Sequence, residues 1–328
     1  MKVSFYVLII LGIGLSCEEG LKSSSENANF KNDETVSNVI SYKKLDNFAS
    51  GSGMAFFNNF FYIVGDDDPY LTKVNNEGEI IVKWQLWDTT NVQNGRINKK
   101  VKHDFEAMSL FPFKQDTVFL IFGSGSVTPT RDLIYTFNPS TEKLSHLEGE
   151  AFFTWLKQAA ELTDEEINLE GACFSNDKLF LFNRHNNEVY TLSASNFLKF
   201  IEEGETSNLT LEKNHFILPT YKGDTARFSG ASIIEGENKI LFSASIETTD
   251  QWEDDGDILG SFIGVIKLNE FDAKTPYFCK PVYQNDSTRF EGKIEALHGF
   301  TTENDKLSIY FITDDDDGTT GWGRIKPF

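Results

Sequence analysis

The chain has 328 residues, of which 40% are hydrophobic and 14% aromatic, enough to bury a large core in one β domain or two ordinary ones. Its formal net charge of −20 argues against nucleic acid as a partner, because the phosphates would be repelled. That charge fits a secreted or cell-surface protein, and also one that binds divalent cations. The 30 phenylalanines, with Val, Ile, Tyr and Thr throughout, favour strands over helices.

The N-terminal segment MKVSFYVLIILGIGLSC has one Lys, an apolar run too short to span a bilayer and small residues before Cys17. It predicts a signal peptide over residues 1–16 and resembles the bacterial lipoprotein type, in which Cys17 becomes the lipidated N-terminus. An ordinary signal peptide with an incidental cysteine is the alternative. Glu18 and Glu19 favour sorting to the outer membrane, so we expect the cell envelope, periplasmic or surface-exposed. Residues 17–35 are polar and aperiodic, which predicts a flexible tether before a single domain at 36–328.

Five stretches of this domain share one pattern. Each has a Glu or Ser, then a small Gly or Ala, an apolar strand, a polar turn and a second apolar strand. Such self-similarity is typical of a repeat architecture. The residues at the shared position, separated by 54, 64, 59 and 66 positions, are Ser52, Glu106, Glu170, Ser229 and Glu295.

Two further strands fit between successive repeats. They lie at 70–75 and 80–86, 133–138 and 143–147, 188–193 and 215–220, and 262–268 and 280–285. The fifth repeat has only 322–328, and residues 38–46 can supply its missing strand. Four antiparallel strands per repeat predict an all-β fold, a five-bladed β-propeller whose ring is closed by the N-terminal strand. An irregular β-sandwich is the alternative, but it gives no reason for five similar inner strands.

Two short helical insertions interrupt the strands. Residues 150–167 space Phe, Trp, Leu and Ala as a helix does, and residues 193–205 are a second candidate; both are expected on the rim. Cys173 falls in an innermost strand and Cys279 in an outermost one, too far apart for a disulfide. Both are therefore predicted to be buried thiols, and no Cys/His cluster suggests zinc.

The five shared residues should form a ring, because the first strand of each propeller blade lines the central channel. Three glutamates there repel one another unless some are protonated or a cation lies between them. Their oxygens and two Ser hydroxyls make a hard ligand set that suits Ca²⁺ better than zinc or copper. We predict one axial Ca²⁺ held by this ring; the alternative is that each Glu hydrogen-bonds a neighbouring blade.

Basic side chains are expected near this ring. The residues two positions before its members share their orientation by the period of two, and include Asp104, Asn168, Arg227 and Lys293. The ends of the second strands, including Asp66, Arg184 and Glu247, should reach the same face. Arg184, Arg227, Lys293 and Arg131 beside a metal would suit an anion such as phosphate. Alternatively, these basic groups pair with acidic residues of adjacent loops.

The remaining sequence motifs give little indication of function. The acidic runs 250–261 and 314–321 lack the spacing of an EF-hand, which favours a solvated hairpin. Neither a G-x-S-x-G nor a P-loop is present, so no nucleophile and no catalytic residue is assigned.

The order Ser, Glu, Glu, Ser, Glu along five blades resembles the calcium-activated nucleotidases, or soluble apyrases, over roughly residues 38–328. The best local matches are RFSGASIIEGENKILFSASIETTD and NLEGACFSNDKLFLFNRHNN. The resemblance implies a five-bladed propeller, one axial Ca²⁺ on the five ring residues, and Arg184 as a phosphate contact. The chain departs from the family at three places. Gly53 stands where the family has an acid, residues 123–126 replace a Gly-Lys-Glu-Trp turn, and only Arg184 remains of two paired arginines. It is also similar to esterase-like and phytase-like bacterial propellers and to lipoprotein families of unassigned function.

Two functions follow as hypotheses. The first is a calcium-dependent hydrolase of phosphate esters or anhydrides, acting on a small anionic substrate. The second is a non-catalytic propeller with a structural Ca²⁺ that binds a glycan, peptide or protein, with Trp87, Trp252 and Trp322 near loops as candidate sugar platforms. We expect a monomer that touches the membrane only through its lipid anchor.

Overall fold

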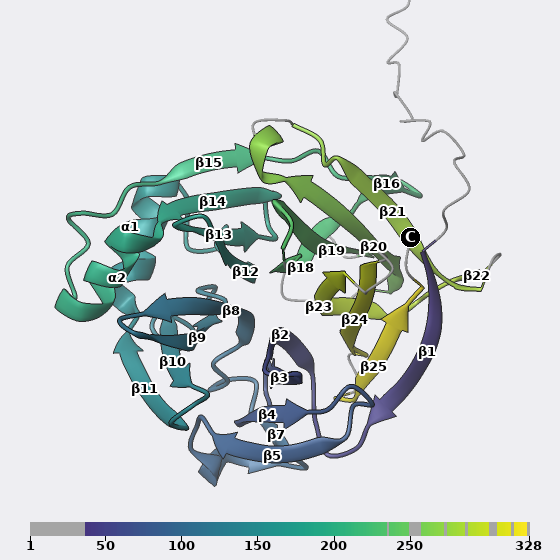
Figure 1. The fold of residues 1–328 in the computed structure, drawn as a ribbon, viewed down its shortest axis with the longest axis horizontal. Coiled ribbons are helices and arrows are strands. Elements are labelled where there is room, and N and C mark those ends of the chain that lie inside the picture. Colours follow the sequence, from purple (N-terminus) through teal and green to yellow (C-terminus); the bar gives the residue numbers. More distant parts are fainter. Residues whose placement is uncertain are drawn as a thin grey trace, which may run out of the picture. The chain divides into compact units, whose positions relative to one another are not determined.

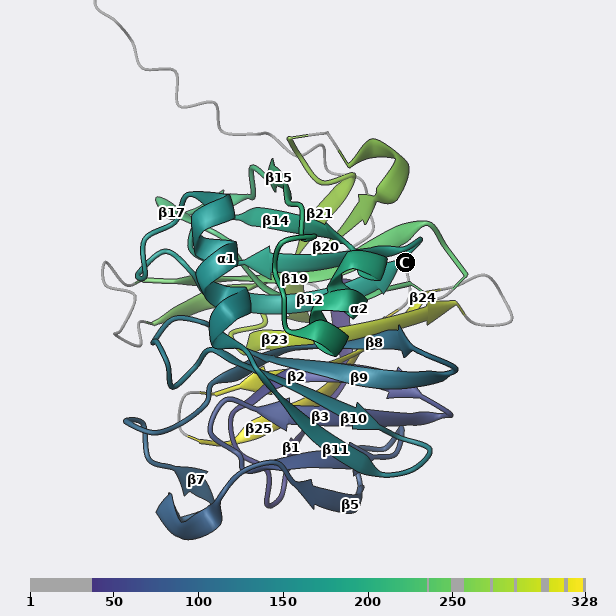
Figure 2. The ribbon, with the colours of Figure 1, turned by 90° about the vertical axis from the view of Figure 1, so that its left-hand side faces the viewer.

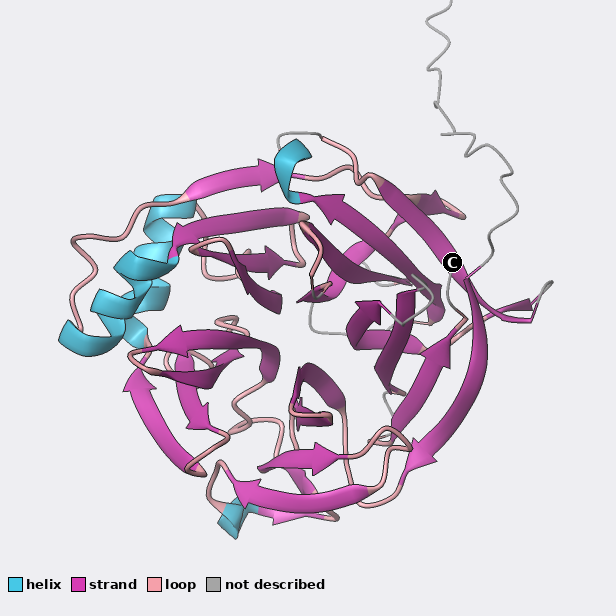
Figure 3. Ribbon diagram, in the orientation of Figure 1, coloured by secondary structure: helices cyan, strands magenta, loops and turns pink. Residues whose placement is uncertain are grey.

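Antiparallel β-strands form most of the computed structural model, which describes residues 37–234, 236–248, 257–271, 274–285, 288–301, 307–315 and 318–326 (Figure 3). These residues belong to one compact unit, Glu34–Phe328. The predicted signal peptide, Cys17, the tether and most of the acidic run 250–261 lie outside the described residues.

Among the described residues, three antiparallel four-stranded sheets follow one another along the chain. In each sheet, strands that are consecutive in sequence pair as neighbours (Figure 1). The first sheet holds β2 Gly51–Phe57, β3 Phe60–Gly65, β4 Tyr70–Val74 and β5 Ile80–Gln85. The second holds β8 Phe105–Phe113, β9 Asp116–Gly123, β10 Leu133–Asn138 and β11 Lys143–Glu148. The third holds β12 Leu169–Ser175, β13 Lys178–Asn183, β14 Glu188–Ser193 and β15 Glu212–His215.

A nine-stranded sheet completes the unit and contains two further antiparallel runs of four. The fourth run is β18 Arg227–Ile233, β19 Lys239–Glu247, β20 Ile258–Lys267 and β21 Phe278–Asn285. The fifth run is β23 Lys293–Thr301, β24 Leu307–Asp314, β25 Thr320–Ile325 and β1 Ser37–Leu45. The short β22, Thr288–Arg289, pairs with β21.

The N-terminal strand completes the last run, as the sequence predicts. β1 pairs antiparallel with β25, from Leu45 opposite Thr320 to Val39 opposite Ile325. Its first residues also pair in parallel with β21, where Ser37 lies opposite Val282. This parallel pair, which the sequence analysis did not anticipate, joins the fourth and fifth runs into one sheet.

One predicted strand is wrong in position. The outermost strand of the third sheet is the polar β15, Glu212–His215, and not residues 215–220. Phe216 and Leu218 are instead buried between the third sheet and the fourth run, with the Phe216 ring centroid 6.1 Å from that of Phe228. The apolar run fills core beside the sheet, whereas a solvent-facing outer strand tolerates polar residues.

Both predicted helices form, and both are shorter than predicted. They are α1, Glu150–Ala160, and α2, Ala194–Glu203. Figures 1 and 2 show them at the outer edge, and the rings of Phe152 and Phe197 pack with centroids 5.3 Å apart. In the described part of the chain, no helix combines the length and apolarity needed to cross a membrane.

The remaining elements are short. They are two 3-10 helices, Thr89–Asn91 and Leu268–Glu270, and the strand pairs β6 Val92–Gln93 with β7 Arg96–Ile97 and β16 Thr220–Tyr221 with β17 Asp224–Thr225.

The apolar core of the described residues is divided into five clusters, each between two successive sheets or runs. One cluster joins the fifth run to the first sheet, so the series closes on itself. Sheets packed face to face around a common axis are the arrangement of a β-propeller (Figure 1). The all-β, propeller-type fold predicted from the sequence is therefore confirmed. Cys173 and Cys279 are buried and unpaired, also as predicted, and burial raises the pKa of both thiols.

The closure between the last run and the first sheet should be a main source of stability. Phe61 on β3 is fully buried there, with ring centroids 4.9 Å from Tyr310 and 5.0 Å from Trp322. We expect Phe61→Ala to lower the free energy of unfolding by about 3–5 kcal/mol, measured by urea denaturation. Ile81→Ala, at a 52% exposed position of β5, is the control and should cost about 0.5 kcal/mol or less. Equal losses in the two variants would contradict this role of the closure.

Candidate functional site

All five residues of the predicted ring lie in the same backbone feature. At each of them the pairing between the innermost strand and its neighbour skips one residue, which is a β-bulge. A bulge turns the side chain of its extra residue away from the normal alternation and is common beside active sites. The skipped residues, on β2, β8, β12, β18 and β23 in turn, are Ser52, Glu106, Glu170, Ser229 and Glu295.

The three glutamates of this set converge. Glu106, Glu170 and Glu295 each offer a carboxylate oxygen, and these three atoms lie within 4.8 Å of one another. Glu170 is only 6% exposed and Glu295 only 2% exposed. We call these three residues the acidic triad; three separate sheets or runs supply it.

The two serines brace the strands that carry the triad. Ser52 Oγ donates a hydrogen bond to the carbonyl of Phe105, and Ser229 Oγ donates one to the carbonyl of Ile294 over 2.6 Å. Each acceptor immediately precedes a triad glutamate in the next sheet or run. The bond between neighbouring sheets that the sequence analysis considered for the glutamates is therefore made by the serines. A donating hydroxyl retains lone pairs that can face a cation.

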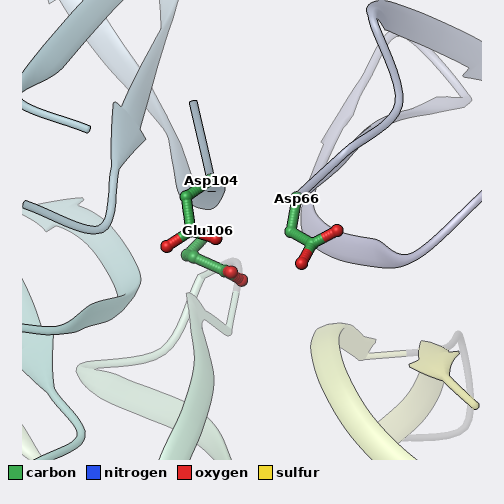
Figure 4. A group of neighbouring side chains, drawn as sticks. All are labelled: Asp66, Asp104 and Glu106. Carbon is green, nitrogen blue, oxygen red and sulfur yellow. The ribbon is translucent and has the colours of Figure 1, made fainter. Parts of the chain in front are cut away.

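A second acidic group shares Glu106 with the triad. Asp66, Asp104 and Glu106 also have oxygens within 4.8 Å of one another, and Figure 4 shows Asp66 across from the other two. Lys102 forms ion pairs with both Asp66 and Asp104, the latter at 2.8 Å. Arg131 Nη1 lies 2.7 Å from Asp104 Oδ2. In this second group, the side-chain ammonium of Lys102 already supplies the positive charge between the carboxylates.

Two cations and a further carboxylate lie on the other side of the triad. Lys293 Nζ is 2.8 Å from Glu295 Oε1 and 3.0 Å from Glu247 Oε1. Arg184 Nη2 is 2.6 Å from the same Glu247 oxygen, and its Nε is 3.8 Å from Glu170 Oε1. Asn168 donates a hydrogen bond of 2.9 Å to Glu170 Oε1. Glu247 thus holds Arg184 and Lys293 in place beside the triad.

Burial and repulsion shift the protonation of these carboxyl groups. The pKa of Glu106 is well above its ordinary value, first because of burial and then because of Glu170 and Asp104. Burial likewise raises the pKa of Glu295 well above its usual range, although Lys293 opposes this. Burial raises the pKa of Asp66 to about 6. The pKa of Glu247 falls to about 2 despite its burial, because Arg184 and Lys293 stabilise its charge.

The predicted contacts of a substrate are partly assembled here. Asp104, Asn168, Arg184 and Lys293 adjoin the triad, whereas Arg227 is exposed and donates to the carbonyl of His185 over 3.1 Å. Arg184 and Lys293 pair with acidic groups, which was the alternative that the sequence left open.

Two partners were missed by the sequence analysis. Lys102 was not considered at all, although its place two residues before Asp104 is a usable signal by the period of two. Glu247 was placed on the correct face but given no role. Both act through pairs that only the folded chain brings together.

If every group at this site were ionised, negative charges would outnumber positive ones. Among the residues that the structure describes, six carboxyl groups at this site face four cationic side chains: Asp66, Asp104, Glu106, Glu170, Glu247 and Glu295 against Lys102, Arg131, Arg184 and Lys293. If all are ionised, two negative charges remain, equal to the charge of one divalent cation. Lys293 lies close to Glu295 Oε1, but neither Glu295 oxygen accepts an aligned hydrogen bond from a described residue. A buried carboxylate in this state calls for a physical explanation.

Comparisons with known proteins add a family and leave the activity open. Residues 47–323 match a family described as "Family of unknown function (DUF6929)", and a search of the curated proteins gave no match. The match is to a family without an assigned activity, so the resemblance to the calcium-activated nucleotidases stays a prediction.

Solved structures give only distant similarity. A glutaminyl cyclase from Myxococcus xanthus is 10% identical, with 89% of this chain and 97% of that chain covered and a TM-score of 0.47. The WD40 β-propeller domain of Doa1 is 9% identical, with 89% and 97% covered and a TM-score of 0.35. A virginiamycin B lyase from Staphylococcus aureus is 11% identical, with 88% and 73% covered and a TM-score of 0.33. At these scores none of them assigns a function to this chain.

The raised pKa of Glu106 predicts how stability depends on pH when no metal is present. A folded state that holds a proton more tightly than the unfolded state is favoured at low pH, and this stabilisation is lost as pH rises through the raised pKa. In a chelator, we therefore expect Glu106 to lower the melting temperature, relative to Glu106→Gln, by an amount that grows from about pH 5 to pH 8, since glutamate ordinarily titrates at 4.5. At pH 8 the melting temperature of Glu106→Gln should exceed that of the wild type by roughly 2–4 °C per kcal/mol of repulsion removed.

Thermal unfolding of both proteins between pH 5 and 8 measures this effect. The depressed pKa of Glu247, about 2, places its own contribution below that window. A difference in melting temperature between the two proteins that stays constant from pH 5 to pH 8 would contradict the expectation.

Proposed function

The chain belongs to the family of unknown function DUF6929, and we propose that it is a five-bladed β-propeller with one axial Ca²⁺ that hydrolyses phosphate esters or anhydrides. The observation that carries the proposal is the acidic triad, in which Glu170 and Glu295 are buried, Glu106 is half-buried, and the three carboxylate oxygens lie within 4.8 Å of one another. Like charges are held so closely in a protein when a cation compensates them or when they share protons.

Three repeated features support a count of five blades. Five antiparallel groups of four strands follow one another, counting β1 with the last group. The five core clusters of the described residues each separate two successive groups. Each innermost strand has its own bulge at the equivalent position.

The donor atoms favour Ca²⁺ over other metals. Glu106, Glu170 and Glu295 would bind the cation through carboxylate oxygens, with Ser52 and Ser229 as further oxygen ligands. Calcium takes six to eight oxygen ligands in flexible geometry, whereas zinc prefers nitrogen and sulfur and magnesium requires a near-ideal octahedron. We assign only one cation, because Lys102 already neutralises Asp66 and Asp104 in the second acidic group.

The neighbouring groups suit a phosphate-bearing substrate. When bound, Ca²⁺ can polarise a phosphoryl oxygen as a Lewis acid. Arg184 and Lys293 lie next to triad glutamates and could offset negative charge on the phosphoryl group. Glu247 orients both side chains through one shared oxygen, and a phosphate would have to displace or share that interaction.

The same pairing favours a second candidate function. Because Glu247 already satisfies Arg184 and Lys293, the cation could be purely structural and the propeller a binding module for a glycan, peptide or protein. Tryptophan platforms for a sugar gain little support. Trp322 is buried, and the ring of Trp87 lies over His103 with centroids 3.7 Å apart, while Trp252 falls outside the described residues.

Calcium should stabilise the protein through the triad. We expect 1 mM Ca²⁺ to raise the melting temperature relative to excess chelator, because a ligand at 100 times its Kd adds about 2.7 kcal/mol to the folded state. Glu170→Gln should abolish most of this shift. Glu212→Gln, at an exposed position of β15, is the matched control and should keep it. The same melting temperature with and without calcium in the wild type would refute the axial metal.

Activity then separates the two candidate functions. Release of inorganic phosphate from p-nitrophenyl phosphate and from nucleoside diphosphates should require calcium and fail in folded Glu170→Gln. A clear calcium shift without phosphate release from any of these substrates would favour the binding module.

We propose further that Cys17 anchors the protein to the outer membrane as a lipoprotein. Cys17→Ser should move the protein from the membrane fraction to the soluble fraction, because a diacylated N-terminus would then be missing. Mass spectrometry of the mature wild-type N-terminus should find the lipid on Cys17. An unmodified Cys17 inside a mature chain, or a soluble wild-type protein, would contradict the anchor.

A further inference from the structure

The charges around the acidic triad limit the kind of phosphate ester that can bind there. Six carboxyl groups and four cationic side chains lie at this site among the residues that the structure describes. With all of them ionised, two negative charges remain, and the proposed Ca²⁺ cancels these, because metal ligands bind in their deprotonated form. The site with its cation is therefore formally neutral.

The charged groups that border this site cancel one another. Asp314 at the end of β24 and the exposed Arg227 at the start of β18 carry opposite charges. Two ion pairs flank them, Asp67 with Arg96 at 2.6 Å and Asp68 with Lys83 at 3.6 Å. In the described part of the chain, these groups therefore supply no surplus of positive charge for a ligand with two negative charges.

The hydrogen-bond donors beside the triad are already in use. Arg184 donates through Nη1 to Ser245 Oγ over 3.1 Å and through Nη2 to Glu247 Oε1 over 2.6 Å, and its Nε lies 3.8 Å from a triad carboxylate. Lys293 Nζ lies 3.0 Å from an oxygen of Glu247 and 2.8 Å from one of Glu295. Neither edge of the Arg184 guanidinium therefore presents two unoccupied nitrogens for the bidentate contact that suits a dianionic phosphate.

The side chains that would meet the phosphate remain within its reach. Those of Arg184, Glu247 and Lys293 are 12%, 13% and 17% exposed. The pKa of Glu247 is about 2 despite its burial, because Arg184 and Lys293 stabilise its charge. A phosphate beside these two cations thus meets a fixed negative charge, which repels a doubly charged group more strongly than a singly charged one.

Building on the calcium-dependent hydrolase proposed for this site, we propose that its substrates are phosphodiesters, which carry one negative charge, and that Glu247 disfavours phosphomonoesters. Hydrolysis of a diester forms one P–O bond to water and breaks one P–O bond to an alcohol. One proton of the water goes to the alcohol and the other to solvent, which leaves a dianionic monoester. The repulsion that disfavours monoesters as substrates then favours release of this product.

Two phosphonates of similar shape test the charge preference by binding alone. In mildly alkaline buffer phenylphosphonate carries two negative charges, whereas methyl phenylphosphonate carries one because a methyl group caps one oxygen. We expect the calcium-loaded protein to bind methyl phenylphosphonate about tenfold more tightly by calorimetric titration, since like charges brought together at a binding site cost affinity. Equal or tighter binding of phenylphosphonate would overturn the proposal and leave the calcium site standing.

Glu247→Gln tests the residue to which the preference is assigned. The amide keeps the shape and an acceptor oxygen for Arg184 and Lys293 but loses the negative charge. We expect this variant to bind phenylphosphonate about tenfold more tightly than the wild type does, and so to lose the preference. Glu212→Gln, the exposed control on β15, should keep it. A folded Glu247→Gln with the full preference would contradict the role of Glu247, and the wild-type comparison decides the substrate class even if this variant fails to fold.

Turnover separates this proposal from the function on which it rests. Calcium-dependent hydrolysis of p-nitrophenyl phosphate in preference to bis(p-nitrophenyl) phosphate would overturn the substrate class alone. Failure of the calcium-loaded protein to bind either phosphonate and to hydrolyse either ester would overturn the proposed phosphate hydrolysis as well. Preference for the diester, together with tighter binding of methyl phenylphosphonate, is the result expected.

Discussion

The mutual repulsion of the three triad glutamates, whose carboxylate oxygens lie within 4.8 Å of one another, is the constraint on which the site depends. The innermost strands must approach closely for the sheets to close around the axis, and this approach forces the carboxylates together. The residue after each bulge is accordingly small. A Cβ on Gly171 would lie 2.9 Å from the backbone nitrogen of Ala231, and one on Gly230 would collide with the carbonyl oxygen of Glu295. The same close approach of the innermost strands therefore packs the backbone tightly and concentrates negative charge at the axis.

Ion pairs around the triad offset part of this negative charge. On one side Lys102 bridges Asp66 and Asp104, and on the other Glu247 bridges Arg184 and Lys293. These arrangements satisfy the outer groups and leave the centre with the least compensation. Glu295, with neither oxygen in an aligned hydrogen bond to a described residue, is the clearest case. This lack of compensation at the centre is the reason for proposing a cation there, because metal binding would relieve the repulsion and release protons together.

The two ends of the innermost strands have opposite chemistry although the same five strands form both. At the start of each strand the bulge places a polar side chain toward the axis. Two or more residues later, the same strands supply methionine, alanine and aromatic side chains around a cavity of about 310 Å³. The two ends of the innermost strands thus offer separate chemical environments along one axis.

The ring positions, both helices and the strand supplied by residues 38–46 could be read from the sequence, because repeat spacing and hydrophobic periodicity are properties of the chain itself. The outer strand of the third sheet could not be predicted in this way. Whether residues 215–220 pair with β14 as a strand or pack their side chains into the core depends on the neighbouring run, where Phe216 meets Phe228. The bridging roles of Lys102 and Glu247, the serine bonds between neighbouring sheets, and the apolar cavity were also settled only by the tertiary structure. Each arises where segments far apart in sequence meet, and their distances follow from how the sheets close around the axis, which local patterns do not encode.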